Sequence, residues 1–143
     1  MFVKEVMSTD VKTVRSTDTV KDAACVMNDS MIGCLMVLSG NGGIEGIVTE
    51  RDILVDVVAE GKDPCSVKVG DIMTKDLVVI SPENTLEEAA DVMTQKTIKK
   101  LPVVQGSKLV GIVTATDLVA YEKDLIEKVA DLLTISPMKR IGG

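Results

Sequence analysis

The sequence predicts an α/β (α+β) protein built from two tandem copies of a β-α-β-β-α unit. Three observations predict it: the chain matches itself, each copy has a capped helix with an apolar stripe, and each copy then has two β-rich runs joined by a turn signal. Val3 aligns with Val69, and after the loss of one loop residue Gly46–Thr49 aligns with Gly111–Thr114. A register that holds through the whole unit indicates an internal repeat.

The first half of each unit predicts a strand followed by a helix. Residues 11–14 form a short β run, and Thr19 with Asp22 makes a capping box that begins the helix. In the second unit Thr85 and Glu88 begin the equivalent helix. The apolar stripes that these helices bury are Val20, Ala23, Ala24 and Met27 in the first copy and Leu86, Ala89, Ala90 and Met93 in the second.

The second half of each unit predicts an antiparallel hairpin and another helix. The β-rich runs 34–38 and 43–49 are separated by SGNG, and KLPVV and LVGIVT flank QGSK in the second copy. The following helices begin near Glu50 and Ala115, and the second is expected to continue to about Leu133 with an interruption or bend. We expect the first repeat at 1–60, a linker at 61–70, the second repeat at 71–120, and a C-terminal helix and tail at 121–143, with Pro137 marking the tail.

Composition excludes several classes of function. The chain has no histidine, which excludes Ser-His-Asp triads and Cys-His dyads, and its three cysteines show no CxxC metal spacing. A net charge of −6 with one Phe and one Tyr is unsuited to nucleic acid. No apolar run approaches the roughly 18 residues of a membrane span, and the start lacks signal-peptide features. We expect a cytoplasmic protein that is not an enzyme, with no catalytic residue, no metal, no required cofactor and no membrane contact.

The pattern G-I-V-T-x-x-D occurs twice, from Gly46 to Asp52 and from Gly111 to Asp117. In each copy a strand ends at threonine and a helix begins, so the pattern has a structural interpretation as a capping box. It also has an interpretation as a ligand site, because a hydroxyl and helix N-terminal amides suit phosphate and a carboxylate accepts hydrogen bonds from ribose hydroxyls. Arg51 adds a guanidinium that suits phosphate. Its occurrence in both copies favours a nucleotide site.

The repeat and its doubled motif resemble a pair of CBS domains, the cystathionine β-synthase type repeat, over almost the whole chain from about Val3 to Val119. The resemblance implies a stand-alone, prokaryotic-type pair whose repeats pack with pseudo-two-fold symmetry and leave two clefts. Many such pairs bind AMP, ADP, ATP or S-adenosylmethionine there. The resemblance further implies that the aspartate of one repeat holds ribose, its Thr or Ser holds phosphate, and adenine lies against the other repeat.

Carried onto this sequence, the resemblance predicts two sets of ligand-binding residues. One cleft would use Thr114, Thr116 and Asp117, with adenine near Val11, Lys12, Ile32, Gly33 and Cys34. The other would use Thr49, Arg51 and Asp52, with adenine near Leu77, Val78, Ile98 and Lys99. Lys99 and Lys100 would reach phosphates in either cleft, unless they are a solvated basic pair. Gly33 and Cys34 replace this pair in the first copy, and Met36 stands where the second has Pro102, so the clefts should differ in anion affinity.

The sequence also suggests partners. The second helices carry the apolar residues Ile53, Leu54, Val57, Val58, Leu118 and Val119. They either complete the intramolecular core or join two chains into a homodimer, and the C-terminal helix either covers that seam or docks a partner. We expect a regulatory sensor of an adenosyl ligand that acts on an unknown effector protein. The alternatives are a structural dimerisation module with non-binding clefts, a nucleotide hydrolase or transferase, which the missing Walker A motif argues against, and nucleic-acid binding through Arg51, Lys99 and Lys100.

Overall fold

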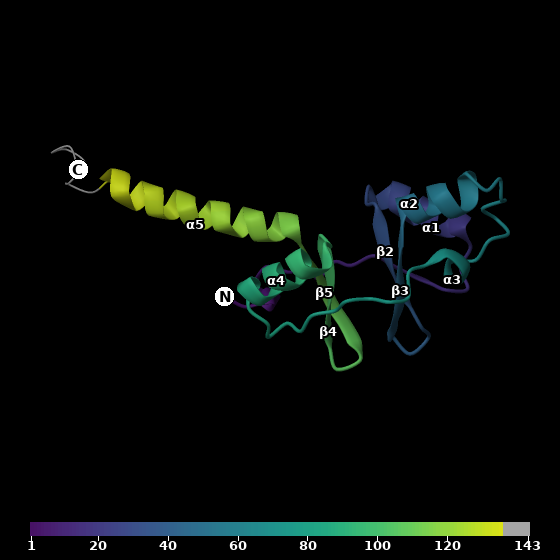
Figure 1. The fold of residues 1–143 in the computed structure, drawn as a ribbon, viewed down its shortest axis with the longest axis horizontal. Coiled ribbons are helices and arrows are strands. Elements are labelled where there is room, and N and C mark those ends of the chain that lie inside the picture. Colours follow the sequence, from purple (N-terminus) through teal and green to yellow (C-terminus); the bar gives the residue numbers. More distant parts are fainter. Residues whose placement is uncertain (136–143) are drawn as a thin grey trace.

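The computed structural model describes residues 1–135, over which two β-sheets are flanked by helices (Figure 1). The first unit contains β1 (Thr13–Arg15), α1 (Val20–Ser30), β2 (Cys34–Leu38), β3 (Ile44–Thr49), α2 (Glu50–Ile53) and the π-helical segment η2 (Leu54–Val58). The second contains α4 (Leu86–Lys96), β4 (Lys100–Gln105), β5 (Lys108–Thr114) and α5 (Ala115–Ile135). Short helical turns precede each unit, η1 (Val3–Glu5) and α3 (Val69–Ile72). The predicted fold class is confirmed.

The two sheets are similar but not identical. In the first, β1 pairs parallel with β2, which pairs antiparallel with β3. In the second, β4 pairs antiparallel with β5, and the expected first strand is reduced to one parallel bridge between Ile80 and Val103. Ile80 donates to the carbonyl of Pro102 at 3.0 Å and accepts from Val104 at 2.8 Å. Pro82, two residues later, has no N–H to donate and so cannot extend this pairing.

The helices α1 and α4 begin at the capping residues that the sequence predicts. Thr19 and Asp22 form a reciprocal capping box at the start of α1, and Thr85 and Glu88 do so at the start of α4. The backbone N–H of Thr85, and then the side chains of Asn84 and Thr85, lower the pKa of Glu88 from its ordinary value. The stability that this carboxylate contributes is therefore present above its unfolded-state pKa and is lost as the pH falls through the lower folded-state pKa.

The helix α5 differs from expectation in being continuous. It runs unbroken over 21 residues from Ala115 to Ile135, where an interruption or bend was predicted. No Gly or Pro interrupts these residues, so nothing in the backbone ends the helix early. Its distal part extends away from the body of the molecule (Figure 1). The predicted tail around Pro137 lies outside the described residues, and no helix within residues 1–135 is long and apolar enough to cross a membrane.

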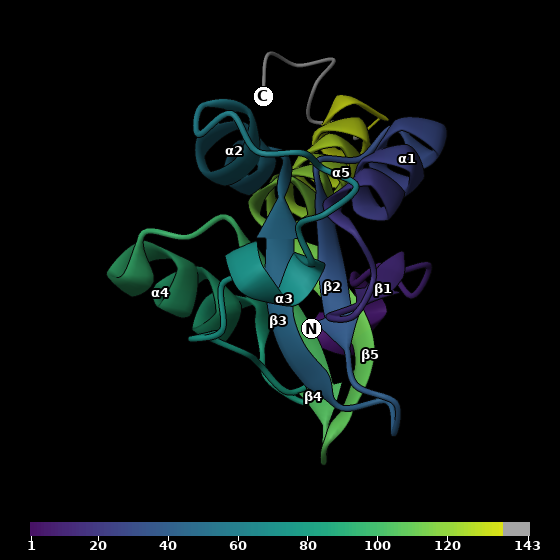
Figure 2. The same ribbon diagram turned by 90° about the vertical axis from the view of Figure 1, so that its right-hand side faces the viewer.

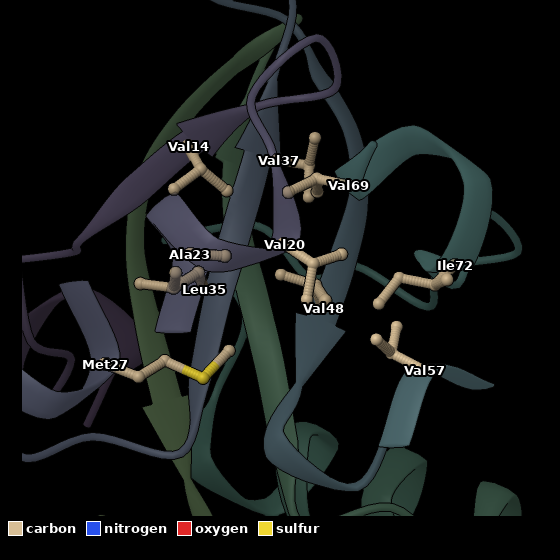
Figure 3. Close-up of a cluster of buried hydrophobic side chains, with 10 residues drawn as sticks. All are labelled: Val14, Val20, Ala23, Met27, Leu35, Val37, Val48, Val57, Val69 and Ile72. Atoms are coloured by element: carbon tan, nitrogen blue, oxygen red, sulfur yellow. The ribbon is translucent and has the colours of Figure 1, made fainter. Parts of the chain in front are cut away.

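Each unit completes its core with the segment that precedes the other unit. The first core contains Val69 and Ile72 of α3 beside residues of α1, β2 and β3 (Figure 3). The second core contains Val3 of η1 beside Ala89 and Leu101. Val3 and Val69 are fully buried, and burial of such a side chain contributes about 1.5–3 kcal/mol. The segments before each unit are therefore exchanged between the two cores.

Equivalent backbone hydrogen bonds hold the exchanged segments in place. Ser8 and Ile112 exchange two bonds of 2.9 Å, and Thr74 and Ile47 exchange bonds of 2.8 and 3.0 Å. These short pairings attach each segment to the G-I-V-T strand of the opposite unit. As a result the β2–β3 and β4–β5 hairpins lie next to one another, with α4 on one side and α1 to α3 on the other (Figure 1, Figure 2).

The glycine of each G-I-V-T strand allows this close approach. A Cβ at Gly46 would lie 2.7 Å from the carbonyl oxygen of Thr74, and a Cβ at Gly111 would lie 2.8 Å from that of Ser8. Because the obstructing atoms belong to the backbone, a side chain there would push the exchanged segment off the strand. The glycine of the motif is therefore needed for the exchanged segment to pack against the strand. Neither the capping nor the ligand-site interpretation of the motif predicts this role.

We predict that Gly46→Ala and Gly111→Ala each lower the free energy of unfolding by about 1–3 kcal/mol, the usual cost of overpacking. Gly40→Ala is the matched control, because its new Cβ would make only an ordinary 3.6 Å contact with Arg15 and should change stability by less than about 0.5 kcal/mol. Urea denaturation of the three variants measures these changes. Equal stability of all three would show that the close approach imposes no constraint.

Candidate functional site

One of two clefts between the units contains Thr49 and is called the Thr49 cleft. It has a volume of about 860 Å³, within the roughly 300–1,000 Å³ typical of small-molecule sites. Its lining includes Thr49 at the end of β3 and Pro102 on β4, so both units contribute. The remaining lining residues are Gly33, Cys34, Ile47, Glu50, Arg51, Thr74, Asp76, Leu77, Val78, Thr97, Ile98, Lys99 and Lys100.

The other cleft contains Thr114 at the end of β5 and is called the Thr114 cleft. Its volume is about 280 Å³, close to the lower limit of typical ligand sites. Its lining residues are Ser8, Asp10, Val11, Lys12, Ile32, Gly33, Cys34, Met36, Lys100, Ile112 and Thr114. The strand end comes from the second unit and the opposite wall from the first, the reverse of the Thr49 cleft.

The two clefts are the same arrangement built twice. Every residue that lines the Thr114 cleft has its repeat equivalent in the Thr49 cleft. The pairs are Ser8 with Thr74, Asp10 with Asp76, Val11 with Leu77, Lys12 with Val78, Ile32 with Ile98, Gly33 with Lys99, Cys34 with Lys100, Met36 with Pro102, Ile112 with Ile47 and Thr114 with Thr49. An approximate two-fold axis between the units therefore relates the clefts.

Both Thr-x-x-Asp motifs form capping boxes. The N–H of Thr49 donates to Oδ2 of Asp52 at 2.9 Å, and the N–H of Asp52 donates to Oγ1 of Thr49 at 3.1 Å. Thr114 and Asp117 repeat this geometry with the same distances. The structural interpretation of the motif is thus confirmed. Capping does not use all the hydrogen-bond donors and acceptors of these side chains. Each threonine hydroxyl keeps its proton to donate, and each carboxylate keeps Oδ1 and further lone pairs to accept.

The backbone amides at these helix starts are mostly engaged. The N–H of Glu50 donates to the carbonyl of Gly33 at 2.9 Å, and that of Ala115 donates to the carbonyl of Lys99 at 2.8 Å. The N–H groups of Asp52 and Asp117 donate to the hydroxyls of the capping threonines. Side chains rather than a row of backbone amides must therefore provide most of the contacts to an anion at either strand end.

The side chains around the Thr49 cleft favour an anion. Arg51, Lys99 and Lys100 contribute three positive charges against the carboxylates of Glu50 and Asp76. Among residues 1–135 none of the three cations forms an ion pair within 4.0 Å. In the Thr114 cleft the counterparts of Arg51 and Lys99 are uncharged.

Most of the predicted site residues line the clefts. Asp52, Thr116 and Asp117 line neither cleft. The two aspartates are half-buried and hydrogen-bonded to the strand-end threonines, and Thr116 is exposed. Leu77 lines the Thr49 cleft, as expected. Residues outside the predicted set also line the clefts, namely Ser8, Asp10, Met36 and Ile112 in one and Ile47, Glu50, Thr74, Asp76, Thr97 and Pro102 in the other. Ser8 and Thr74 line the clefts because they lie in the exchanged segments. The repeat alignment, which pairs these two residues, was the sequence signal that could have identified them.

Three comparisons place this chain among known proteins. The CBS domain model matches residues 3–58 and 69–124. The CBS domain-containing protein YhcV of Bacillus subtilis is 37% identical over 116 residues, covering 81% of both chains. The solved CBS domain pair of protein MJ0100, in complex with 5′-methylthioadenosine and S-adenosyl-L-methionine, superimposes with a TM-score of 0.76 at 26% identity, covering 87% of this chain and 97% of that one.

A further similar structure is the hexameric CBS-CP12 protein from bloom-forming cyanobacteria. It has a TM-score of 0.74 and 36% identity, and the match covers 90% of this chain and 74% of that one. Two matched repeats, a similar relative of comparable length and structural neighbours of the same fold agree with one another. The chain therefore belongs to the CBS domain family and contains two CBS domains in tandem, the arrangement of a regulatory CBS pair.

Proposed function

We propose that this CBS pair is a non-catalytic sensor that binds an adenine nucleotide, AMP, ADP or ATP, or S-adenosylmethionine in its two clefts. The observation that carries the proposal is the doubled cleft, in which the threonine strand end of one unit faces the segment before the second strand of the other. The methylthioadenosine and S-adenosylmethionine complex of the MJ0100 pair supports an adenosyl ligand.

The roles proposed for the residues follow from their chemistry. In the Thr49 cleft the threonine hydroxyl and Arg51 would contact phosphate, and the oxygen of Asp52 that does not cap the helix would accept from ribose hydroxyls. The apolar side chains of Val78 and Ile98 would pack against adenine. Thr114 and Asp117 would act in the same way in the Thr114 cleft, with Thr116 at its edge and Val11 and Ile32 against the base.

A ligand in either cleft would contact both units. Binding can shift the molecule between two arrangements only by its unequal affinity for them. A cleft that closes on the ligand supplies such a difference, because residues from opposite units must approach the same molecule. We propose that a separate effector protein detects this change.

We predict that the preferred adenosyl ligand stabilises the chain by about 2.7 kcal/mol at a hundredfold excess over its dissociation constant. Asp52→Ala and Asp117→Ala should each weaken binding in their own cleft at least tenfold, the minimum expected from lost hydrogen bonds to a charged group. Calorimetric titration with AMP, ADP, ATP, S-adenosylmethionine and, as a base control, GTP measures both effects.

Asp22→Ala is the matched control for this experiment. Asp22 makes the same capping box with Thr19, but Thr19 lines neither cleft, whereas Thr49 and Thr114, the partners of Asp52 and Asp117, line one each. All three variants should lose about 1 kcal/mol or less of unliganded stability, and Asp22→Ala alone should keep wild-type affinity. If no adenosyl ligand binds the wild-type chain, the clefts are non-binding and the module is structural. If Asp22→Ala weakens binding as much as the others, the aspartates act only as caps.

We further propose that two chains form a homodimer through α5. From Glu122 onward every described side chain of this helix is exposed, and its large apolar residues remain between 48% and 64% exposed. These residues are Leu125, Ile126, Val129, Leu132 and Leu133, and Val119, which precedes them, is 68% exposed. The first turns of α5 pack on the second core, but its distal part leaves its apolar side chains exposed to water, and pairing two copies about a two-fold axis would bury them. The hexameric CBS-CP12 protein supports self-association.

We predict that Leu125→Asp with Leu132→Asp raises the dimer dissociation constant at least a hundredfold. The control is Glu127→Lys, which changes an exposed charged residue between them and should leave the dimer intact. Sedimentation velocity over a range of concentrations measures the constant. A wild-type chain that stays monomeric at high concentration, or a dimer unaffected by the double substitution, would contradict pairing through α5.

A further inference from the structure

The two clefts share part of their wall. Gly33, Cys34 and Lys100 line both clefts. Cys34 begins β2 and Lys100 begins β4, so the two residues occupy equivalent positions in the repeat and meet near the axis that relates the clefts. The Nζ atom of Lys100 lies 3.4 Å from Sγ of Cys34. An exact repeat would place two identical side chains here, whereas this chain has one ammonium and one thiol.

Apart from Lys100, the clefts have different charges available for an anion. The Thr49 cleft has Arg51 and Lys99. The Thr114 cleft has Lys12, but Nζ of Lys12 lies 3.3 Å from Oδ1 of Asp10 in an ion pair. Of the cations that line the Thr114 cleft, Lys100 is therefore the one that forms no ion pair among residues 1–135.

A single lysine cannot serve both clefts at once. The ε-ammonium is a compact point charge at the end of one flexible stem, so contact with a phosphate in one cleft moves it away from the other. The Thr49 cleft retains two further cations when Lys100 is withdrawn, and the Thr114 cleft retains only the paired Lys12. The loss is thus larger for an anionic ligand than for an uncharged one, and larger in the Thr114 cleft.

We propose that Lys100 couples the two clefts, so that a phosphorylated adenosyl ligand in one cleft weakens the binding of a second anionic ligand in the other. This inference rests on the proposed function of the clefts. The coupling is reciprocal, because the same ammonium is withdrawn whichever cleft fills first. Its expected size is about tenfold, within the usual range of coupling between sites. An uncharged adenosyl ligand does not compete for the ammonium and binds both clefts independently.

The test compares products of dissociation constants, which do not depend on which cleft fills first. Calorimetry with AMP gives the two stepwise constants of the wild-type chain. Asp52→Ala leaves the Thr114 cleft and Asp117→Ala leaves the Thr49 cleft, and each gives one single-cleft constant. Asp52→Asn and Asp117→Asn, which retain a capping oxygen, replace these variants if the alanine forms do not fold. The wild-type product should exceed the single-cleft product about tenfold.

Three controls isolate Lys100. In a Lys100→Met background the two products should agree, and the AMP affinity of the Thr114 cleft should fall towards that for 5′-methylthioadenosine. With 5′-methylthioadenosine the products should agree in the wild-type background as well. Lys108→Met, an exposed lysine of β5 that lines neither cleft, should keep the tenfold difference. Equal products for AMP in the wild type, or a difference that persists in Lys100→Met, would overturn the coupling. Absence of any adenosyl binding would overturn the proposed function itself.

Discussion

Two short backbone pairings, between Ser8 and Ile112 and between Thr74 and Ile47, hold the two CBS domains in register. They attach the segment before each unit to the strand that ends at the Thr-x-x-Asp threonine of the other unit. The residues that follow each pairing, Asp10 and Asp76, then lie in the cleft walls. The geometry of both clefts thus depends on a contact that only glycine permits at the paired strand.

The strand-end motif stabilises a helix start and, in the proposed function, contacts the ligand with the same side chains. Thr49 and Asp52 satisfy the first turn of α2, and one carboxylate oxygen and one hydroxyl proton remain. The box also occurs at the starts of α1 and α4, away from the clefts, so its presence alone does not mark a site. What distinguishes the two G-I-V-T boxes is the opposite unit, which the exchanged segments bring to the strand end. Each cleft is therefore a property of the pair rather than of either unit.

The elements of the fold were predictable because their signals are local. Capping boxes at Thr19 and Thr85 and the apolar stripes of α1 and α4 depend on residues within a few positions of one another. The reduced strand at Ile80 and the unbroken α5 were not predicted. The first depends on a bridge to β4 made in the folded state, and the second continues because no Gly or Pro interrupts residues 115–135.

The candidate site was predictable in its strand ends and less so in its walls. The doubled motif identified Thr49 and Thr114, and the family resemblance supplied the opposite walls, such as Ile32 and Ile98. The exchange of Val3 and Val69 between cores was not predictable, since equivalent positions in a repeat do not state which core each residue enters. Nor did the sequence indicate that Cys34 and Lys100 meet, because that contact exists only where the two units face each other.

Native-state hydrogen exchange at the amides of Ser8, Ile47, Thr74 and Ile112 tests most directly whether the exchanged segments hold the pair together. These four amides donate the cross-unit bonds. They should be protected to the same free energy as core amides of β2 and β4, because the segments can leave only when the units unfold. Exchange of the four amides through local opening, at a free energy well below that of the strands, would show that the clefts do not depend on these pairings.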